Sequence, residues 1–135
     1  MTGVQTCALP ICFEVLNTHK APAAIGPYCQ GTKQGSLVLT SGQLPINPEN
    51  GELVNEIKTA TKQSLTNCLE VVMAAGGKLT DISKCTVLLK DIKDFPAVNE
   101  VYTEFFGDHK PARSCFQVGA LPKDALIEIE AIAYV

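Results

Sequence analysis

The segment that most constrains the fold is residues 127–134, which read Ile-Glu-Ile-Glu-Ala-Ile-Ala-Tyr. Because side chains alternate between the two faces of a strand, one face is wholly apolar. The other face begins with Glu128 and Glu130 but ends with Ile132 and Tyr134. Second faces that are half apolar are usually buried. This strand therefore needs a layer on one side and some cover on the other, unless its second face stays partly solvated.

Two segments have the spacing of amphipathic helices. Apolar residues recur at helical intervals from Ile57 to Ala75, and Gly76-Gly77 supplies a stop. A second helix is expected after Asp94, which would cap it, with Pro96 in its first turn. Strands are predicted at 13–16, 29–32, 36–44 and 83–90, and in two C-terminal segments containing 111–115 and 126–133.

This order, βββ-α-β-α-ββ, predicts a single α+β domain with two helices packed on one face of a mixed sheet. No third layer remains in the chain to cover the second face. We therefore expect another copy of the same chain to cover it.

Composition excludes several classes of function. A chain of 135 residues with a formal net charge of -3 lacks the basic stripe that a nucleic-acid partner requires. No apolar run approaches the roughly 18 residues that a membrane span needs. The six cysteines have no CxxC spacing, and neither His19 nor His109 stands near them as a zinc partner. They are interpreted as reduced thiols of a cytoplasmic protein, with no metal site.

Residues 1–12 differ from the rest of the chain. They carry no charged side chain and show no clean periodicity. Their apolar stretch is too short for a signal peptide, lacks a basic region and is interrupted by Gln5, Thr6 and Pro10. The run resembles the in-frame translation of a sequencing-adapter oligonucleotide. We therefore interpret residues 1–12 as a non-native tail and residues 13–135 as the domain.

Arg113 and Glu128 are the side chains that indicate chemistry, and they lie on two strands that follow one another in the sequence. An arginine fork donates two parallel hydrogen bonds to a carboxylate. A glutamate can orient or deprotonate a water molecule. Together they could hold a small organic acid and hydrolyse a bond beside its carboxylate. The alternative is a surface arginine and an edge-strand glutamate without a catalytic role.

Two other residues suggest nucleophiles, but weakly. Cys115 has no histidine placed to activate it, since His109 lies across a loop, so it is better interpreted as a core thiol. Ser41 lacks both a base and a GxSxG elbow, which favours a role as a hydrogen-bond donor.

Four short motifs give the chain a family resemblance. In order along the sequence they are Ala-Ala-Ile-Gly-Pro-Tyr at 23–28, Thr-Ser-Gly-Gln at 40–43, Pro-Ala-Arg-Ser-Cys at 111–115 and Ile-Glu-Ile-Glu-Ala at 127–131. From about Phe13 to its C-terminus the chain resembles the RidA (YjgF) family of enamine/imine deaminases. The resemblance implies a chorismate-mutase-like fold and a homotrimer with clefts between subunits. It also implies cofactor-free hydrolysis of 2-iminobutanoate and 2-iminopropanoate to 2-keto acids and ammonia.

The resemblance also assigns roles by position. Arg113 matches the arginine that binds the substrate carboxylate, and Glu128 matches the residue that activates the attacking water. The positions that match the lining of the cleft or hold the ligand are Tyr28, Ser41, Gly42, Asn99 and Cys115. Without the resemblance, Tyr28 would be interpreted as a turn residue and Asn99 as a solvated helix residue.

Two other functions stay open at this point. The first is a non-catalytic binding protein or chaperone-like trimer that uses the same cleft. Glu128 argues against it, because a carboxylate binder needs no second carboxylate facing its anion. The second is a ribonuclease or translation inhibitor, which the acidic balance and the lack of a basic, aromatic surface disfavour. The sequence does not indicate which imine is preferred.

Overall fold

The computed structural model describes Gly3–Val4 and residues 13–135. Gly3–Val4 forms strand β1, which pairs antiparallel with β2 (Phe13–Asn17) through Leu16 and Asn17. The remaining residues of the segment 1–12 lie outside the described residues. The interpretation of that segment as a dispensable tail therefore stays a prediction.

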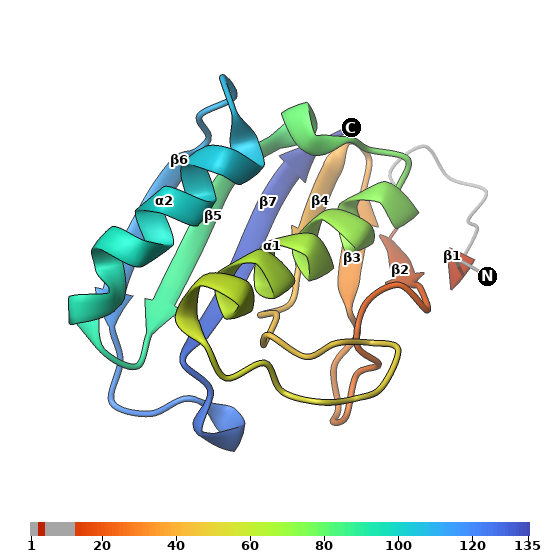
Figure 1. The fold of residues 1–135 in the computed structure, drawn as a ribbon. Helices are drawn as coiled ribbons and strands as arrows, with labels where there is room; N and C mark the ends of the chain where they lie inside the picture. Colours follow the sequence, from red (N-terminus) through yellow and green to blue (C-terminus); the bar gives the residue numbers. More distant parts are fainter. Residues whose placement is uncertain (1–2, 5–12) are drawn as a thin grey trace.

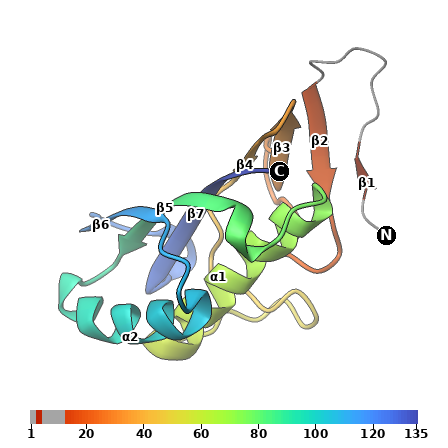
Figure 2. The same ribbon diagram turned by 90° about the horizontal axis from the view of Figure 1, so that it is seen from above.

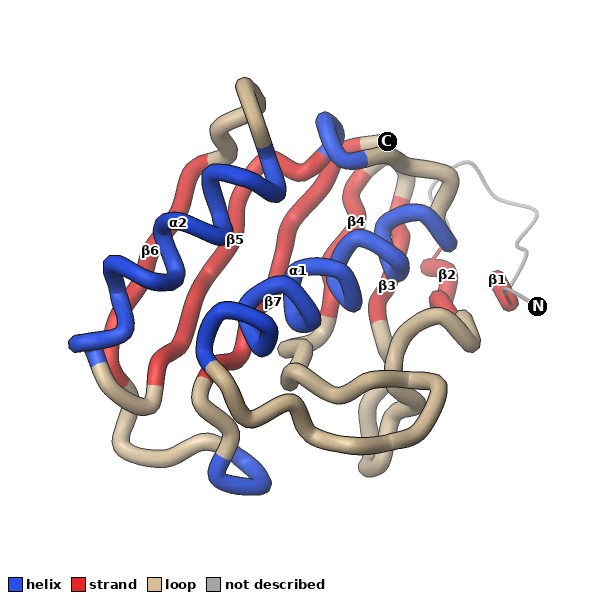
Figure 3. The backbone as a smooth tube through the Cα atoms, viewed as in Figure 1, coloured by secondary structure: helices blue, strands red, loops and turns tan. Residues whose placement is uncertain are grey.

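One mixed sheet forms the centre of the fold (Figures 1 and 3). Its strand order is β1-β2-β3-β4-β7-β5-β6, with β5 and β6 parallel and every other neighbouring pair antiparallel. The strands not yet given are β3 (Gly31–Gln34), β4 (Leu37–Thr40), β5 (Ile82–Leu89), β6 (Ala112–Gln117) and β7 (Ile127–Tyr134). The helices are α1 (Ile57–Ala74) and α2 (Phe95–Phe106), with short 3-10 turns at η1 (Leu79–Asp81), η2 (Ile92–Asp94) and η3 (Pro122–Asp124).

Both helices pack on the same side of the sheet, as Figure 2 shows. They bury the apolar face of β7, where Ile127, Ile129 and Ala133 are wholly inaccessible to solvent. The predicted α+β arrangement is therefore confirmed, and so is the apolar face that led to it. No helix in the described part of the chain is long and apolar enough to cross a membrane.

Helix α1 has a defined start and stop. The Glu56 carboxylate accepts hydrogen bonds from the amides of Lys58 (2.7 Å) and Thr59 (3.1 Å), which caps the first turn. After the helix ends, Gly76 adopts a φ of 89°, a left-handed conformation that glycine reaches without strain. The predicted helix at 57–75 is thus confirmed to within one residue at each end.

The second face of the sheet is open in the single chain. Three large apolar side chains on it remain substantially exposed: Leu39 (41%), Phe116 (48%) and Tyr134 (58%). The register places them on this face, because Leu39 pairs with Ile132 and Tyr134 lies two residues further along β7. The half-apolar second face inferred from the sequence is therefore real. Both helices lie on the other side of the sheet, so neither of them covers this face (Figure 2).

Two local predictions need correction. Strand β4 was expected to run to Leu44 but ends at Thr40, after which Gln43 exchanges two backbone hydrogen bonds with Ile129 of β7. β4 pairs with both β3 and β7, and beyond Thr40 only this isolated bridge continues the strand pairing. Asp94 does occupy the N-cap position of α2, but its side chain makes no capping hydrogen bond, because α2 follows directly on η2.

Candidate functional site

Glu128 lies at the start of β7 and faces the open side of the sheet. Its register partner on β5 is Leu88, whereas the buried Ile127 and Ile129 on either side of it face the helices. Burial, and then the negative charge of Glu130, raise the pKa of the Glu128 carboxyl above its ordinary value. A carboxylate with a raised pKa is a stronger base than one in open water, which suits proton abstraction.

The Glu128 carboxylate lies directly against Gly42. A Cβ atom added at Gly42 would stand 2.8 Å from Glu128 Cδ and 3.0 Å from Oε2, so no larger residue fits without moving the carboxylate. The motif Thr-Ser-Gly-Gln therefore has a structural reason for its glycine here. It lets the backbone after β4 approach the carboxylate closely.

Ser41 and Tyr28 stand beside this contact. The Ser41 hydroxyl donates to the Cys29 carbonyl (2.6 Å), so its proton is engaged in joining two segments of the chain. The Tyr28 hydroxyl accepts from the Ile25 amide (3.4 Å), and half of the tyrosine surface is exposed. These contacts place the loop that carries Tyr28 next to Ser41 and Gly42.

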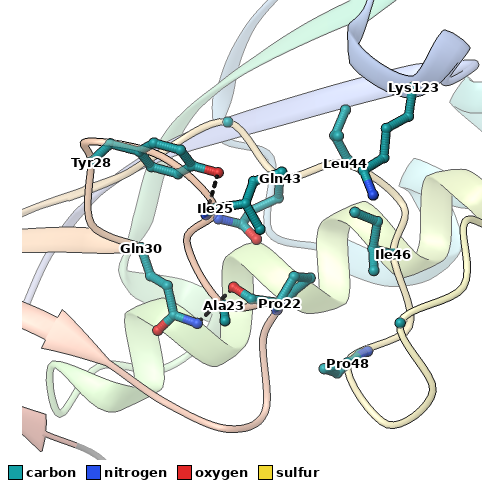
Figure 4. Close-up of a pocket in the computed structure, with 12 residues that line it drawn as sticks. Pro22, Ala23, Ile25, Tyr28, Gln30, Gln43, Leu44, Ile46, Pro48 and Lys123 are labelled. Carbon is teal, nitrogen blue, oxygen red and sulfur yellow. Dashed lines mark hydrogen bonds between the residues drawn. The ribbon is translucent and has the colours of Figure 1, made fainter.

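A cavity of about 300 Å³ opens between this loop and the segment that follows β4. Figure 4 shows Tyr28 and Ile25 toward one end of it and Ile46 and Pro48 toward the other. Its wall is mostly apolar, with Lys123 of η3 as its cationic residue. Tyr28 and Gly42 both line this cavity, so it adjoins Glu128.

Arg113 belongs to a different part of the surface. It lies at the start of the edge strand β6, and its guanidinium stacks over the rings of Tyr102 (4.8 Å) and Phe95 (5.2 Å) on α2. Cation–π contacts of this kind orient a guanidinium while leaving its N–H groups free for a ligand. Arg113 and Asn99 line one groove of about 570 Å³ together with Tyr102, His109 and Lys110.

Cys115 follows Arg113 by two residues and is partly buried on the same face of the sheet. Burial raises the pKa of the Cys115 thiol, and the Arg113 charge offsets only part of that increase. His109 Nε2 lies 2.6 Å from the Ile82 carbonyl oxygen and is engaged there. A thiol with a raised pKa and no free base beside it is a weak nucleophile.

The candidate residues therefore form two half-sites on opposite faces of the sheet. Arg113 pairs with Cys85 on β5, and Cys85 pairs with Ala131, so all three face the helices. Glu128 pairs with Leu88, which faces the other way. The glutamate half-site comprises Tyr28, Ser41, Gly42 and Glu128, and the arginine half-site comprises Asn99, Arg113 and Cys115. The single chain does not bring the two half-sites together.

Sequence reasoning missed several residues of these half-sites. Tyr102 of α2 was not among the candidate residues, yet its ring lies under the Arg113 guanidinium. Gln30 and Asn67 are buried amides that hold the walls of the cavity beside Glu128. A polar side chain within an apolar helical face was the available signal for Asn67. Lys123 carried none.

No cluster of side chains in the described part of the chain could hold a metal ion. The cysteines described there, Cys29, Cys68, Cys85 and Cys115, are free thiols.

The fold and the four sequence motifs together place this chain in a known protein family. Residues 18–135 match the family model described as endoribonuclease L-PSP, so the chain belongs to that family, which includes the RidA and YjgF proteins. A relative from Escherichia coli K12 named 2-iminobutanoate/2-iminopropanoate deaminase is 50% identical over 123 residues, covering 89% of this chain and 96% of its own.

Solved structures agree with the fold. The YjgF gene product of Escherichia coli has a TM-score of 0.87 at 50% identity, covering 89% of this chain and 97% of its own. Escherichia coli TdcF with bound serine has a TM-score of 0.87 at 48% identity, covering 90% and 98%. The resemblance noted in the sequence is therefore confirmed, and with it the chorismate-mutase-like fold of the domain.

Proposed function

We propose that this protein hydrolyses 2-iminobutanoate, 2-iminopropanoate and similar short 2-imino acids to 2-keto acids and ammonia. The observation that carries the proposal is the 50% identity, over 89% of the chain, with a protein named for that activity. The bound serine of TdcF adds that a 48% identical relative accepts a molecule with the carboxylate and nitrogen of such a substrate.

The side chains support a simple mechanism. Arg113 binds the substrate carboxylate through two parallel hydrogen bonds and sets the position of C2. Glu128 takes a proton from a water molecule as the water oxygen bonds to C2, and the C=N electron pair moves to nitrogen. Protonated Glu128 then gives that proton to the nitrogen of the carbinolamine. The hydroxyl proton passes back to the Glu128 carboxylate as the C=O bond forms and the C–N bond breaks, and the departing ammonia takes this proton, leaving the keto acid and a carboxylate at Glu128. Tyr28, Ser41, Gly42, Asn99 and the backbone at Cys115 line the cleft.

A protonated imine is already electrophilic, so this mechanism needs no cofactor. The acid–base part is worth typically about 10²–10⁴-fold, and positioning supplies the rest.

The cleft is built from more than one copy of the chain. Its two essential side chains lie on opposite faces of the sheet within one chain, so Arg113 of one copy would meet Glu128 of another. The half-exposed apolar side chains of the second face favour the same association. We propose a homotrimer with a cleft at each subunit interface, located in the cytoplasm, where thiols stay reduced.

The family description also names an endoribonuclease, but the described site gives little support to cleavage of RNA. The formal net charge of -3 disfavours a polyanionic substrate. A purely binding role is disfavoured by Glu128, because a site that only binds a carboxylate needs no second carboxylate facing it.

The experiment couples the purified protein to a threonine dehydratase and follows imine decay and ammonia release. We expect both to accelerate in proportion to the added protein, and unchanged rates would refute the proposal.

Two variants then test the role of the base. Glu128→Gln keeps the shape of the side chain but lowers turnover by about 10²-fold or more, while 2-oxobutanoate still binds. Cys115→Ala costs far less. If instead Cys115→Ala abolished turnover in a folded protein and Glu128→Gln did not, a covalent thiol mechanism would replace attack by water.

A further inference from the structure

Gln30 is a buried amide whose side chain is engaged on every side. It is 4% exposed and immediately precedes β3. Its Oε1 accepts from the Thr18 amide (2.7 Å), and its Nε2 donates to the carbonyls of Thr18 (3.0 Å), Ala21 (3.1 Å) and Pro22 (2.8 Å). Four hydrogen bonds from one neutral side chain, all to backbone groups, fix the path of the loop that follows β2.

That loop has few hydrogen bonds of its own besides those from the Lys20 amide to Thr18 Oγ1 (3.2 Å) and from the Ile25 amide to the Tyr28 hydroxyl (3.4 Å). Between residues 18 and 28, the described backbone-to-backbone hydrogen bonds outside helices and strands comprise only Tyr28 N to Gly26 O (2.8 Å). The strands on either side do not need the Gln30 side chain, since β2 and β3 pair through their own backbones. The amide therefore orders the loop rather than the sheet.

The same residue also reaches the glutamate half-site. Its backbone carbonyl accepts from the Ser41 amide (2.9 Å), next to the glycine that contacts Glu128. Tyr28 precedes it by two residues. Figure 4 shows the Gln30 side chain extending toward Pro22 beneath the cavity that Tyr28 and Ile25 line.

We propose that Gln30 is a positioning residue for the deaminase reaction, which sets the place of Tyr28 relative to Glu128 by holding the loop at residues 18–22. This inference rests on the proposed function. Gln30 does not touch the substrate; it acts through Tyr28 and through the loop that walls the cavity. Loss of the Gln30 amide is therefore expected to weaken substrate binding more than it slows proton transfer.

The test replaces the Gln30 side chain with an apolar side chain of similar volume. Gln30→Met has similar length but neither donates nor accepts the four hydrogen bonds. We expect KM for the imino acid to rise about tenfold with kcat changed less than about threefold, because a displaced binding residue weakens capture of the substrate. Amide hydrogen exchange should quicken at Thr18 and across residues 18–28, while β7 stays protected.

The matched control is Val72→Ala, which removes two methyl groups from the buried face of α1 and leaves a cavity there. It should lower the melting temperature with an unchanged KM, which separates general destabilisation from loss of position. Gln30→Glu keeps the acceptor for the Thr18 amide but removes the donor, so it should raise KM in the same direction even if Gln30→Met fails to fold.

The outcomes separate the two claims. If the wild-type protein accelerates imine decay but both Gln30 variants keep its KM, or if Val72→Ala raises KM equally, the positioning role is overturned. If the wild-type protein itself has no effect on imine decay, the proposed function fails, whatever the exchange rates of the loop.

Discussion

Two inactive variants of this protein should rescue each other when they assemble together. We expect Arg113→Gln and Glu128→Gln each to lower kcat/KM by about 10²-fold or more, since one loses the carboxylate fork and the other loses the base. The register of β5, β6 and β7 puts these side chains on opposite faces of one sheet. Each variant chain therefore still carries one complete half-site that another copy can use.

The size of the rescue follows from random assembly in a closed ring of head-to-tail interfaces. A cleft is intact when the copy supplying arginine carries the Glu128 substitution and the copy supplying glutamate carries the Arg113 substitution. With equal amounts of the two chains, about one quarter of the clefts meet both conditions. Wild-type chains mixed equally with the double variant also leave about one quarter intact, whereas a site within one chain would leave about one half.

The assay co-expresses the two chains, checks their ratio by mass spectrometry and measures imine decay per cleft. Mixing the two variants after each has assembled serves as the control and should give no rescue until copies exchange. The reasoning is refuted if co-expressed single variants stay as inactive as either alone while the mixture with wild type keeps about half of the activity.

Three further changes have expected outcomes. Glu130→Gln should move the acid limb of the pH profile of kcat to lower pH. The Glu130 charge is the second cause, after burial, of the raised pKa of the Glu128 carboxyl, and activity disappears when that base is protonated. An unmoved acid limb would exclude this coupling. Gly42→Ala should lower kcat about tenfold by displacing the Glu128 carboxylate, whereas Gly119→Ala, where an added Cβ meets nothing within 4 Å, should leave kcat unchanged in the same steady-state assay. A protein that starts at Phe13 after an added Met should keep its melting temperature and activity, and a loss of several degrees in calorimetry would show that the pairing of β1 with β2 matters.

Local patterns were enough to predict the elements of this fold. Helical spacing and a Gly-Gly stop predicted α1, and alternation predicted β7 together with its two unlike faces. Strand ends were less accurate. The excess length assigned to β4 arose because its pairing with β3 and β7 stops at Thr40, and only one isolated bridge, Gln43 to Ile129, continues along β7. The point at which strand pairing stops has no local signature.

The site was harder to predict than the fold. Arg113 and Glu128 are on strands consecutive in sequence, but that order does not show whether the two side chains lie near each other in one chain. In the sheet, β5 inserts between β6 and β7, and the register turns the two side chains to opposite faces. Neither fact is encoded near either residue, because both depend on pairings between distant segments. Gln30 was missed for a similar reason, since its partners lie eight to twelve positions earlier.

The hydrophobic core between the helices and the sheet is complete within one chain, and the two half-sites lie on opposite faces of that sheet. With the proposed cleft between copies, an isolated copy is expected to keep its fold and yet be catalytically silent. On dilution, circular dichroism would report an unchanged protein while activity per chain fell, and concentrating the sample would restore it. The same proposal implies that a newly made chain does nothing to an imine until enough copies have accumulated to associate.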